Sequence, residues 1–160
     1  MTKFFSWLSN VHTPLFVGIL WAAGCLWNVS FNELIKVISP TSLSGENFDP
    51  SQNVFDFVSV ILVAPLIETA LFQALPYYLL NKIDFFRKRI WLIILVSSII
   101  FSLLHIYSIL YVLFAFFPGV LLMTGYHLRQ GRHPFATIFM VHLMINATPL
   151  VYELIFTPSL

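Results

Sequence analysis

Four polar side chains lie inside stretches of sequence that are otherwise apolar: Glu68, His105, His142 and Asn146. An ionisable side chain in hydrocarbon costs at least about 2.5 kcal/mol, so it is seldom there without a function. A carboxylate beside a trapped water molecule can remove a proton as the water attacks a carbonyl group. An imidazole or a carboxamide can stabilise the oxyanion that forms. This set of residue types therefore predicts a hydrolytic site inside a membrane.

Each of these residues also has a purely structural explanation. Polar side chains hold membrane helices together by hydrogen bonds, and Glu68 alone or His142 with Asn146 would suit that role. His105 alone would suit a packed histidine whose hydrogen bonds are satisfied. The common depth of all four favours a reaction site over four separate packing contacts. The sequence offers no serine or cysteine nucleophile paired with a base at this depth, since the nearby serines lack a motif: Ser97, Ser98 and Ser102.

The composition is that of a membrane protein. The 160 residues are 59% hydrophobic and 9% charged, with a mean hydropathy of +0.88. Soluble domains carry about 25% charged residues. The net charge of +1 gives no reason to expect a nucleic-acid partner. The single cysteine, Cys25, excludes an internal disulfide and a cysteine-based metal cluster within this sequence.

Several apolar stretches are long enough to cross about 30 Å of hydrocarbon as helices. We therefore predict an all-α integral membrane bundle of about five transmembrane helices. Pro65 and Pro76 predict a kink or break in the second span. The third and fourth spans are divided near Ser108, where the apolar run pauses only briefly. The predicted spans are residues 14–31, 54–80, 91–107, 109–128 and 135–156.

The chain divides into two predicted parts. Residues 1–53 comprise an N-terminal spanning helix and a polar outer loop, which begins with a short amphipathic turn at Glu33–Ile38. Residues 54–160 form the helical core that carries the four polar residues. The basic residues predict the orientation, because they concentrate in cytosolic loops. With five spans and a cytosolic N-terminus, Lys36 alone falls outside, and the other seven basic residues fall inside: Lys3, Lys82, Arg87, Lys88, Arg89, Arg129 and Arg132.

The helical rise of 1.5 Å per residue gives a depth for each polar residue. From the cytosolic ends of their spans, Glu68 and Asn146 lie ~18 Å deep, His105 ~21 Å and His142 ~12 Å. His142 and Asn146 are four residues apart, so they share one helix face. Glu68 and Gln73 are five apart and point in more divergent directions. Three spans thus supply polar groups to one level, where a bundle can satisfy them mutually.

Three short segments resemble the motifs of a known family. Residues 68–73, Glu-Thr-Ala-Leu-Phe-Gln, resemble the motif E-E-x-x-x-R of the CAAX-protease and bacteriocin-processing family, also called CPBP or Abi. Residues 101–105 match its second motif, F-x-x-x-H, and residues 142–146 match its third, H-x-x-x-N. The order and the placement on separate spans also agree. The resemblance covers roughly residues 58–156.

The resemblance implies a glutamic-type intramembrane protease with no metal or other cofactor. Glu68 would activate the water with help from His105, and His142 with Asn146 would bind the oxyanion. The motif positions Thr69, Gln73 and Phe101 would support the site. Members of the family trim prenylated CAAX proteins or take part in peptide maturation, bacteriocin immunity and regulation.

The resemblance also implies where the protein acts and with what. The expected location is the cell membrane, as a multi-pass protein of a bacterial inner membrane. The expected partners are membrane lipid and a peptide or membrane-protein substrate. The chain is short for the family, so it is either a minimal core or one that needs a partner subunit.

Two positions depart from the family pattern, and three other functions stay open. Thr69 replaces the second Glu and Gln73 replaces the Arg, which removes a matched pair rather than leaving an unpaired charge. One alternative is a catalytically inactive member that acts as a membrane binding or immunity protein. Another is a zinc site made of Glu68, His105 and His142, although no H-E-x-x-H spacing is present. A small transporter or proton relay is the last, although the sequence has no repeat.

Overall fold

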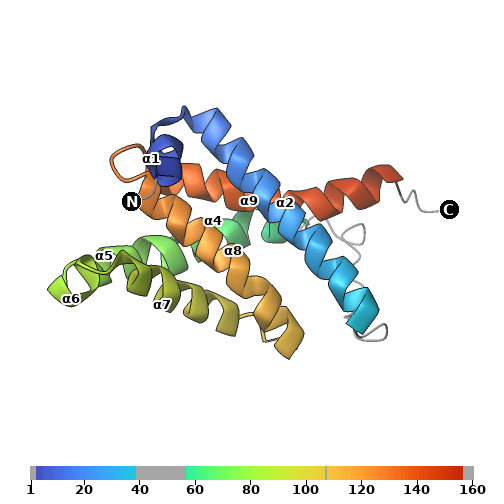
Figure 1. Ribbon diagram of the computed structural model, residues 1–160. Helices are drawn as coiled ribbons and strands as arrows, with labels where there is room; N and C mark the ends of the chain where they lie inside the picture. The colour runs from blue at the N-terminus through green and yellow to red at the C-terminus, as the bar shows by residue number, and fades with distance from the viewer. Residues whose placement is uncertain (1–2, 39–56, 107, 157–160) are drawn as a thin grey trace.

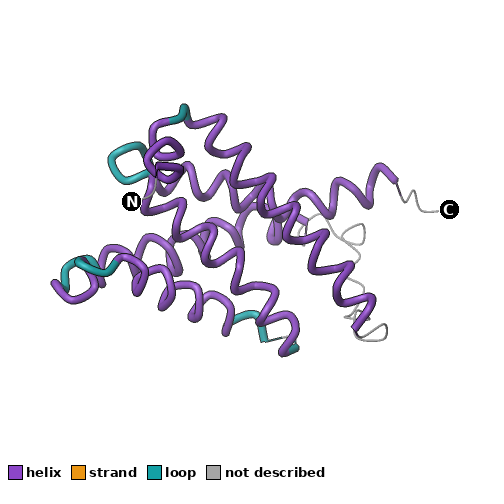
Figure 2. The backbone as a smooth tube through the Cα atoms, in the orientation of Figure 1, coloured by secondary structure: helices purple, strands orange, loops and turns teal. Residues whose placement is uncertain are grey.

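The computed structural model describes residues 3–38, 57–106 and 108–156, and every regular element in these ranges is helical (Figures 1 and 2). Two of the elements, η1 and η2, are π-helical segments within the second long stretch. The elements in chain order are α1 Lys3–Asn10, α2 Thr13–Ile38, η1 Ser59–Val63, α4 Ala64–Glu68, η2 Thr69–Ala74, α5 Leu75–Leu80, α6 Asp84–Arg87, α7 Ile90–Leu103, α8 Ile109–Leu128 and α9 Pro134–Phe156.

Three helical stretches of the described chain are long and apolar enough to cross a membrane: Thr13–Val37, Ser59–Leu80 and Ile109–Leu128. The apolar helix α7 has 14 residues, or about 21 Å. Helix α9 has 23 residues, or about 35 Å. The predicted all-helical membrane fold is therefore confirmed, whereas the count of five spans stays a prediction.

Two predicted boundaries differ from the structure. Helix α2 continues through Ile38, so residues 33–38 extend the first span instead of forming a separate turn; residues 39–53 of the predicted loop lie outside the described residues. Helix α7 ends at Leu103, four residues before the predicted end of its span. The reason is a helix start nearby: Ser108 caps α8 by accepting the backbone N–H of Tyr111 at 3.1 Å. His105 therefore lies in the connection between two helices and not inside one.

The helices pack around a shared apolar core. Helices α7 and α8 run back along one another as a hairpin, and α9 packs against both α2 and α8 (Figure 1). The segment from η1 to α5 contacts α9 and α7. The N-terminal helix α2 is thus part of the same bundle as the later helices. Side chains that are fully buried at its centre come from α2, α7, α8 and α9: Phe16, Ile93, Leu122, Met123, Ile138 and Val141.

The second long helix does not break at its two prolines. The chain stays helical from residue 57 to residue 80, and a π-helical segment precedes each proline. Pro65 follows η1, and Pro76 follows η2. Proline lacks an N–H, and its ring crowds the preceding turn. We attribute the unbroken course to the wider π-helical turns, which accommodate both effects.

Side chains from neighbouring helices donate hydrogen bonds to backbone carbonyl groups in the turns before Pro76 and Pro118. The carbonyl of Phe72, in η2 before Pro76, accepts a hydrogen bond from the Ser97 hydroxyl on α7. Phe114 lies four residues before Pro118 in α8, and its carbonyl accepts the Trp27 indole N–H at 3.1 Å. Backbone groups inside a membrane must be paired within the protein. The carbonyl that Pro118 leaves without a donor therefore joins α8 to α2, and the Phe72 carbonyl joins η2 to α7.

This pairing gives an expected result for Ser97. Replacing Ser97 with Ala should lower the free energy of unfolding by about 0.5–1.5 kcal/mol, since the Phe72 carbonyl loses its donor. Denaturant unfolding in detergent measures the loss. The Ser102→Ala variant is the control, because among the described residues that hydroxyl bonds to Ile99 of its own helix. An equal loss in the two variants would contradict the pairing between helices.

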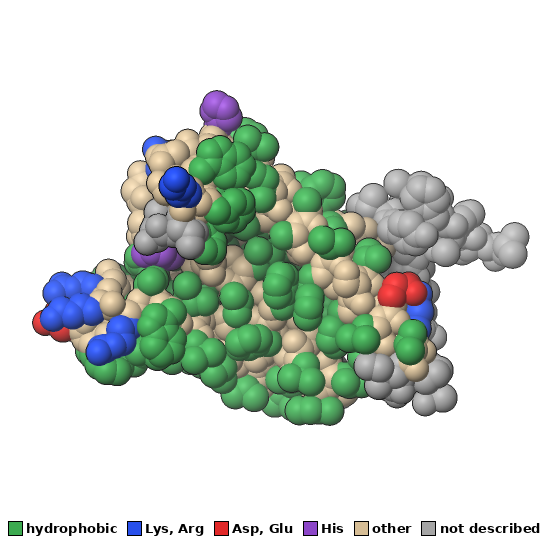
Figure 3. Space-filling view, in the orientation of Figure 1, with side chains coloured by type: hydrophobic (Ala, Val, Ile, Leu, Met, Phe, Trp, Pro, Cys, Tyr) green, Lys and Arg blue, Asp and Glu red, His purple; other side chains and the backbone are tan. Residues whose placement is uncertain are grey.

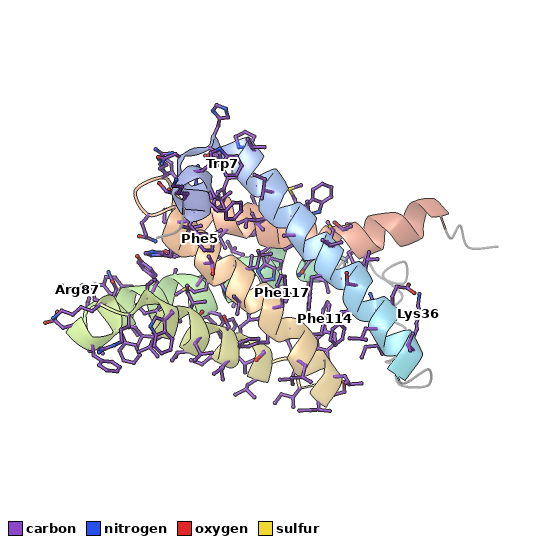
Figure 4. All side chains as sticks on the ribbon, viewed as in Figure 1. Phe5, Trp7, Lys36, Arg87, Phe114 and Phe117 are labelled. Atoms are coloured by element: carbon purple, nitrogen blue, oxygen red, sulfur yellow. The ribbon has the colours of Figure 1, made fainter. Side chains whose placement is uncertain are left out.

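The charged residues are sorted between the two ends of the molecule. Lys and Arg side chains gather at the end that holds α1 and α6 (Figure 3). Lys36, paired with Glu33, lies at the other end (Figure 4). Figure 4 marks the two extremes, Arg87 and Lys36, with the apolar helices between them. The structure thus brings together the basic residues that the sequence assigned to one side of the membrane.

Arg129 is the exception among the basic residues because it is buried, with 1% of its surface exposed. Its guanidinium donates to the carbonyl of Val11 at 3.0 Å and to the hydroxyl of Thr13. It also lies 4.7 Å from the centre of the Phe16 ring. Arg129 therefore ties the end of α8 to the link between α1 and α2, a role that the sequence did not predict.

Candidate active site

The four polar residues singled out from the sequence line one pocket. This pocket has a volume of about 260 Å³ and lies between α2, the η1–α4 segment, α7, α8 and α9. Glu68, His105, His142 and Asn146 all contribute to its wall. The remaining wall is largely apolar: Gly24, Asn28, Val60, Phe101, Tyr111, Phe114, Ala115, Pro118, Leu122, Ile145 and Pro149. Residues up to 125 positions apart in the sequence thus meet in one cavity.

Glu68 and His142 form an ionisable pair across the pocket. The Nε2 atom of His142 lies 3.4 Å from the Oε2 atom of Glu68. The His142 side chain is 5% exposed and that of Glu68 is 22% exposed. Glu68 is the last residue of α4, between η1 and η2, and His142 lies in the middle of α9. The Nδ1 atom of His142 is buried and has no hydrogen-bond partner among the described residues. The carboxylate is therefore held beside an imidazole while part of its surface stays accessible.

His105 is held in a defined orientation by the helix that it follows. Its Nδ1 atom lies 2.8 Å from the carbonyl oxygen of Phe101. A carbonyl can only accept, so Nδ1 carries the proton and Nε2 of the neutral ring has a free lone pair. The Phe101 ring lies 4.6 Å from the His105 ring and 5.8 Å from the His142 ring, measured between centres. The buried Phe101 therefore supports both imidazoles by packing.

Asn146 uses part of its side chain to fix the helix that leads to Glu68. Its amide nitrogen donates to the carbonyl oxygen of Val60 at 3.2 Å. In the π-helical pattern of η1, the donor to that carbonyl would come from Pro65, five residues later, which has no N–H. The carboxamide carries two N–H groups, and the contact with Val60 uses one of them. The second remains for a group inside the pocket.

Thr69 and Gln73 do not line the pocket. Both side chains are fully buried on η2, and neither Thr69 Oγ1 nor the Gln73 carboxamide has a hydrogen-bond partner among the described residues. The sequence predicted that Glu68 and Gln73 point in divergent directions, which holds for an α-helix. In a π-helix the backbone hydrogen bonds join residues five apart. The Glu68 and Gln73 side chains therefore point in more similar directions than they would in an α-helix. This change comes from η2, which the sequence did not predict.

The nearby serine hydroxyls are all engaged with backbone carbonyl groups. Ser97 bonds to Phe72, and Ser98 and Ser102 bond to carbonyls of their own helix. This arrangement agrees with the absence of a serine nucleophile motif. Among the described residues, no group of three His, Cys, Asp or Glu side chains is arranged to hold a metal ion. The zinc alternative therefore gains no support from the positions of Glu68, His105 and His142.

The sequence missed the contribution of the N-terminal helix to this pocket. Gly24 and Asn28 of α2 line it, although none of the three motifs includes that helix. An available signal was the pair Asn28 and Asn32, two carboxamides four residues apart in an apolar helix. Their amide groups bond to one another at 2.7 Å.

Comparison with known proteins gives one finding. A family model described as type II CAAX prenyl endopeptidase Rce1-like matches residues 50–148. The matched range includes all four polar residues of the pocket and excludes α1 and α2. Neither a curated protein nor a solved structure matches the chain significantly.

Proposed function

Because this chain belongs to the Rce1-like family of type II CAAX prenyl endopeptidases, we propose that it is an intramembrane endopeptidase that uses a water molecule activated by Glu68. Family membership implies CAAX-type intramembrane protease activity in general. The observation that carries the finer proposal is the Glu68 carboxylate, 3.4 Å from the buried His142 and facing a pocket that His105 and Asn146 also line. These groups can supply a base and hydrogen-bond donors in one small cavity.

In the first step, water attacks the carbonyl carbon of the substrate peptide bond. Glu68 accepts one proton of the water as the new carbon–oxygen bond forms. The Nε2 lone pair of His105 is free, since Nδ1 is held by Phe101, so it accepts a hydrogen bond from the same water and orients it. The products of this step are a tetrahedral oxyanion and a protonated Glu68.

In the second step, the oxyanion collapses and the carbon–nitrogen bond breaks. Since Glu68 is then protonated, the Nε2–H of His142 can turn from Glu68 to the oxyanion, and the second N–H of Asn146 also donates to it. Glu68 returns its proton to the departing amine nitrogen, which leaves a new carboxyl group and a new amino group. The role of Val60 is indirect: its carbonyl occupies one Asn146 N–H and so sets the direction of the other.

The protein is a membrane protein, and we place it in the cell membrane of a bacterium with its N-terminus in the cytosol. The clustering of basic side chains at one end supports that orientation. The proposed substrate is a peptide or protein held in or at the membrane. The substrate can be a prenylated protein, since the family name refers to CAAX prenyl endopeptidases.

A catalytically inactive binding protein is the second candidate, and one observation favours it. Thr69 and Gln73 occupy the positions of the family's Glu and Arg, and their buried polar atoms have no partner among the described residues. Loss of that charged pair would weaken the alignment of Glu68. In this case the pocket would hold a peptide or membrane partner without cleaving it.

The deciding experiment is cleavage of a library of membrane-derived peptides by the purified protein in lipid, run in ¹⁸O-labelled water. We expect cleavage that a chelator does not reduce, with one ¹⁸O atom in each new carboxyl group by mass spectrometry. Loss of activity on chelation, restored by zinc, would overturn the metal-independent mechanism. A folded protein that binds peptides but cleaves none would favour the inactive binding protein.

A further inference from the structure

A second cavity adjoins the catalytic pocket and lies between α2 and α9. Its volume is about 600 Å³. It shares four wall residues with the catalytic pocket, namely Gly24, Asn28, Ile145 and Pro149. Its other wall residues are Cys25, Val29, Asn32, Glu33, Lys36 and Thr148. We call it the α2 groove, and it continues from the catalytic pocket toward the end of the molecule that carries Lys36.

Most of the α2 groove is built from a helix that the family model does not include. The family match begins at residue 50, whereas α2 ends at Ile38. From Gly24 to Lys36 the helix rises about 18 Å. An extended peptide rises about 3.3 Å per residue, so this length corresponds to about five residues.

We infer that the α2 groove binds an extended polypeptide segment of the substrate on one side of the bond to be cleaved. This inference rests on the proposed function, because a substrate segment in the groove must reach the catalytic pocket beside it. Its walls combine apolar side chains with carboxamides, as a peptide backbone with side chains requires.

The two carboxamides of α2 carry the inference. The Asn32 amide donates to the Asn28 oxygen at 2.7 Å, which leaves the Asn28 amide and the Asn32 oxygen without a hydrogen bond to other described residues. One free donor and one free acceptor complement the C=O and N–H of a peptide group. An isoprenoid or acyl chain would leave both groups unpaired, at a cost in affinity.

The outer end of the groove is charged and solvent-exposed. Lys36 and Glu33 form an ion pair of 2.6 Å with side-chain exposures of 60% and 64%. The Thr148 hydroxyl is already engaged within the protein. It donates to the Met144 carbonyl and accepts a hydrogen bond from the Trp21 indole N–H at 2.8 Å. The groove therefore passes from the catalytic pocket through a carboxamide pair to a charged rim that water reaches.

Cys25 offers a direct reporter, because it lines the groove and is the single cysteine of the chain. The Glu68→Gln variant in lipid vesicles is labelled with a maleimide in the presence of the membrane-derived peptide library or of farnesol, an isoprenoid alcohol. We expect the peptides to slow labelling of Cys25 at least fivefold and farnesol to leave it within twofold. Unchanged labelling with peptides, or equal protection by farnesol, would overturn the inference.

A second measurement is the KM for peptide cleavage by variants that keep Glu68 and change only the groove. The Asn32→Leu variant should raise KM for extended peptides about tenfold, as expected for the loss of one or two hydrogen bonds. The Asn32→Gln variant keeps the carboxamide and should recover most of the affinity. Asn10→Leu, the same substitution on exposed α1, should have no effect. Equal KM values for Asn32→Leu and wild type would overturn the inference.

The two experiments separate failure of the groove from failure of the protease. Cleavage by the wild type without protection of Cys25 would refute peptide binding in the groove and leave the protease in place. Protection of Cys25 without any cleavage would refute the protease and support a groove that binds peptides.

Discussion

Replacing Glu68 with Gln is expected to slow peptide cleavage by about 10²–10⁴-fold, the range that a general base contributes. The carboxamide is nearly the same size, so it fits the pocket and can still accept a hydrogen bond from His142. It cannot accept the proton of the attacking water. The measurement is the initial rate of cleavage in lipid, with the same peptides for variant and wild type. Circular dichroism and the unfolding temperature should stay close to those of the wild type.

The matched control is Asp84→Asn, the same chemical change at an exposed position. Asp84 lies on α6 in an ion pair with Arg87, far from the pocket and with 70% of its side chain exposed. We expect less than a twofold change in rate. Retention of most activity by Glu68→Gln would refute the carboxylate base. An equal loss in both variants would indicate a general effect of charge on the protein in the membrane.

The second large effect is expected at Arg129. The Arg129→Met variant should lower the free energy of unfolding by about 2–4 kcal/mol, since it leaves acceptors at Val11 and Thr13 without their donor. The methionine retains an apolar stem against Phe16 but lacks the guanidinium fork. Denaturant unfolding in detergent measures the loss.

Arg132→Met is the matched control for Arg129. Arg132 is exposed, and its guanidinium donates to the carbonyl of Ser9, in the last turn of α1, at 3.1 Å. Exposed polar contacts contribute about 0–1 kcal/mol, so the control should lose much less stability. A similar loss in the two variants would show that burial of Arg129 adds nothing. A loss of membrane insertion in both would instead support the predicted role of these charges in orienting the chain in the membrane.

The position of Glu68 between two π-helical segments links the fold to the site. Such segments often occur at functional sites, where they alter the direction of side chains within a helix. Here each one precedes a proline, and each is joined to a neighbouring helix by a side chain that donates to its backbone. Asn146 and Ser97 therefore stabilise the helix on both sides of the carboxylate. This arrangement supports a rigid Glu68, which a base for a single water molecule requires.

The sequence by itself determined the class of protein and four polar residues of the pocket. The composition and the lengths of the apolar runs can be read without knowing any contact between helices, and they sufficed to predict a helical membrane bundle. Three short motifs sufficed to identify Glu68, His105, His142 and Asn146, because a polar residue in an apolar span stands out against its neighbours. The separation of basic residues likewise follows from their places between the spans.

Only the tertiary structure decided how these residues are held, because the contacts that hold them join distant parts of the chain. Asn146 and Val60 are 86 residues apart, and Arg129 and Val11 are 118 apart. No local pattern encodes such a pair. The prolines illustrate the limit: their missing N–H predicts a kink or break, but the outcome depends on the π-helical turns and on donors from other helices. Packing between helices likewise decided that His105 lies beyond the end of α7. It also formed the groove along α2.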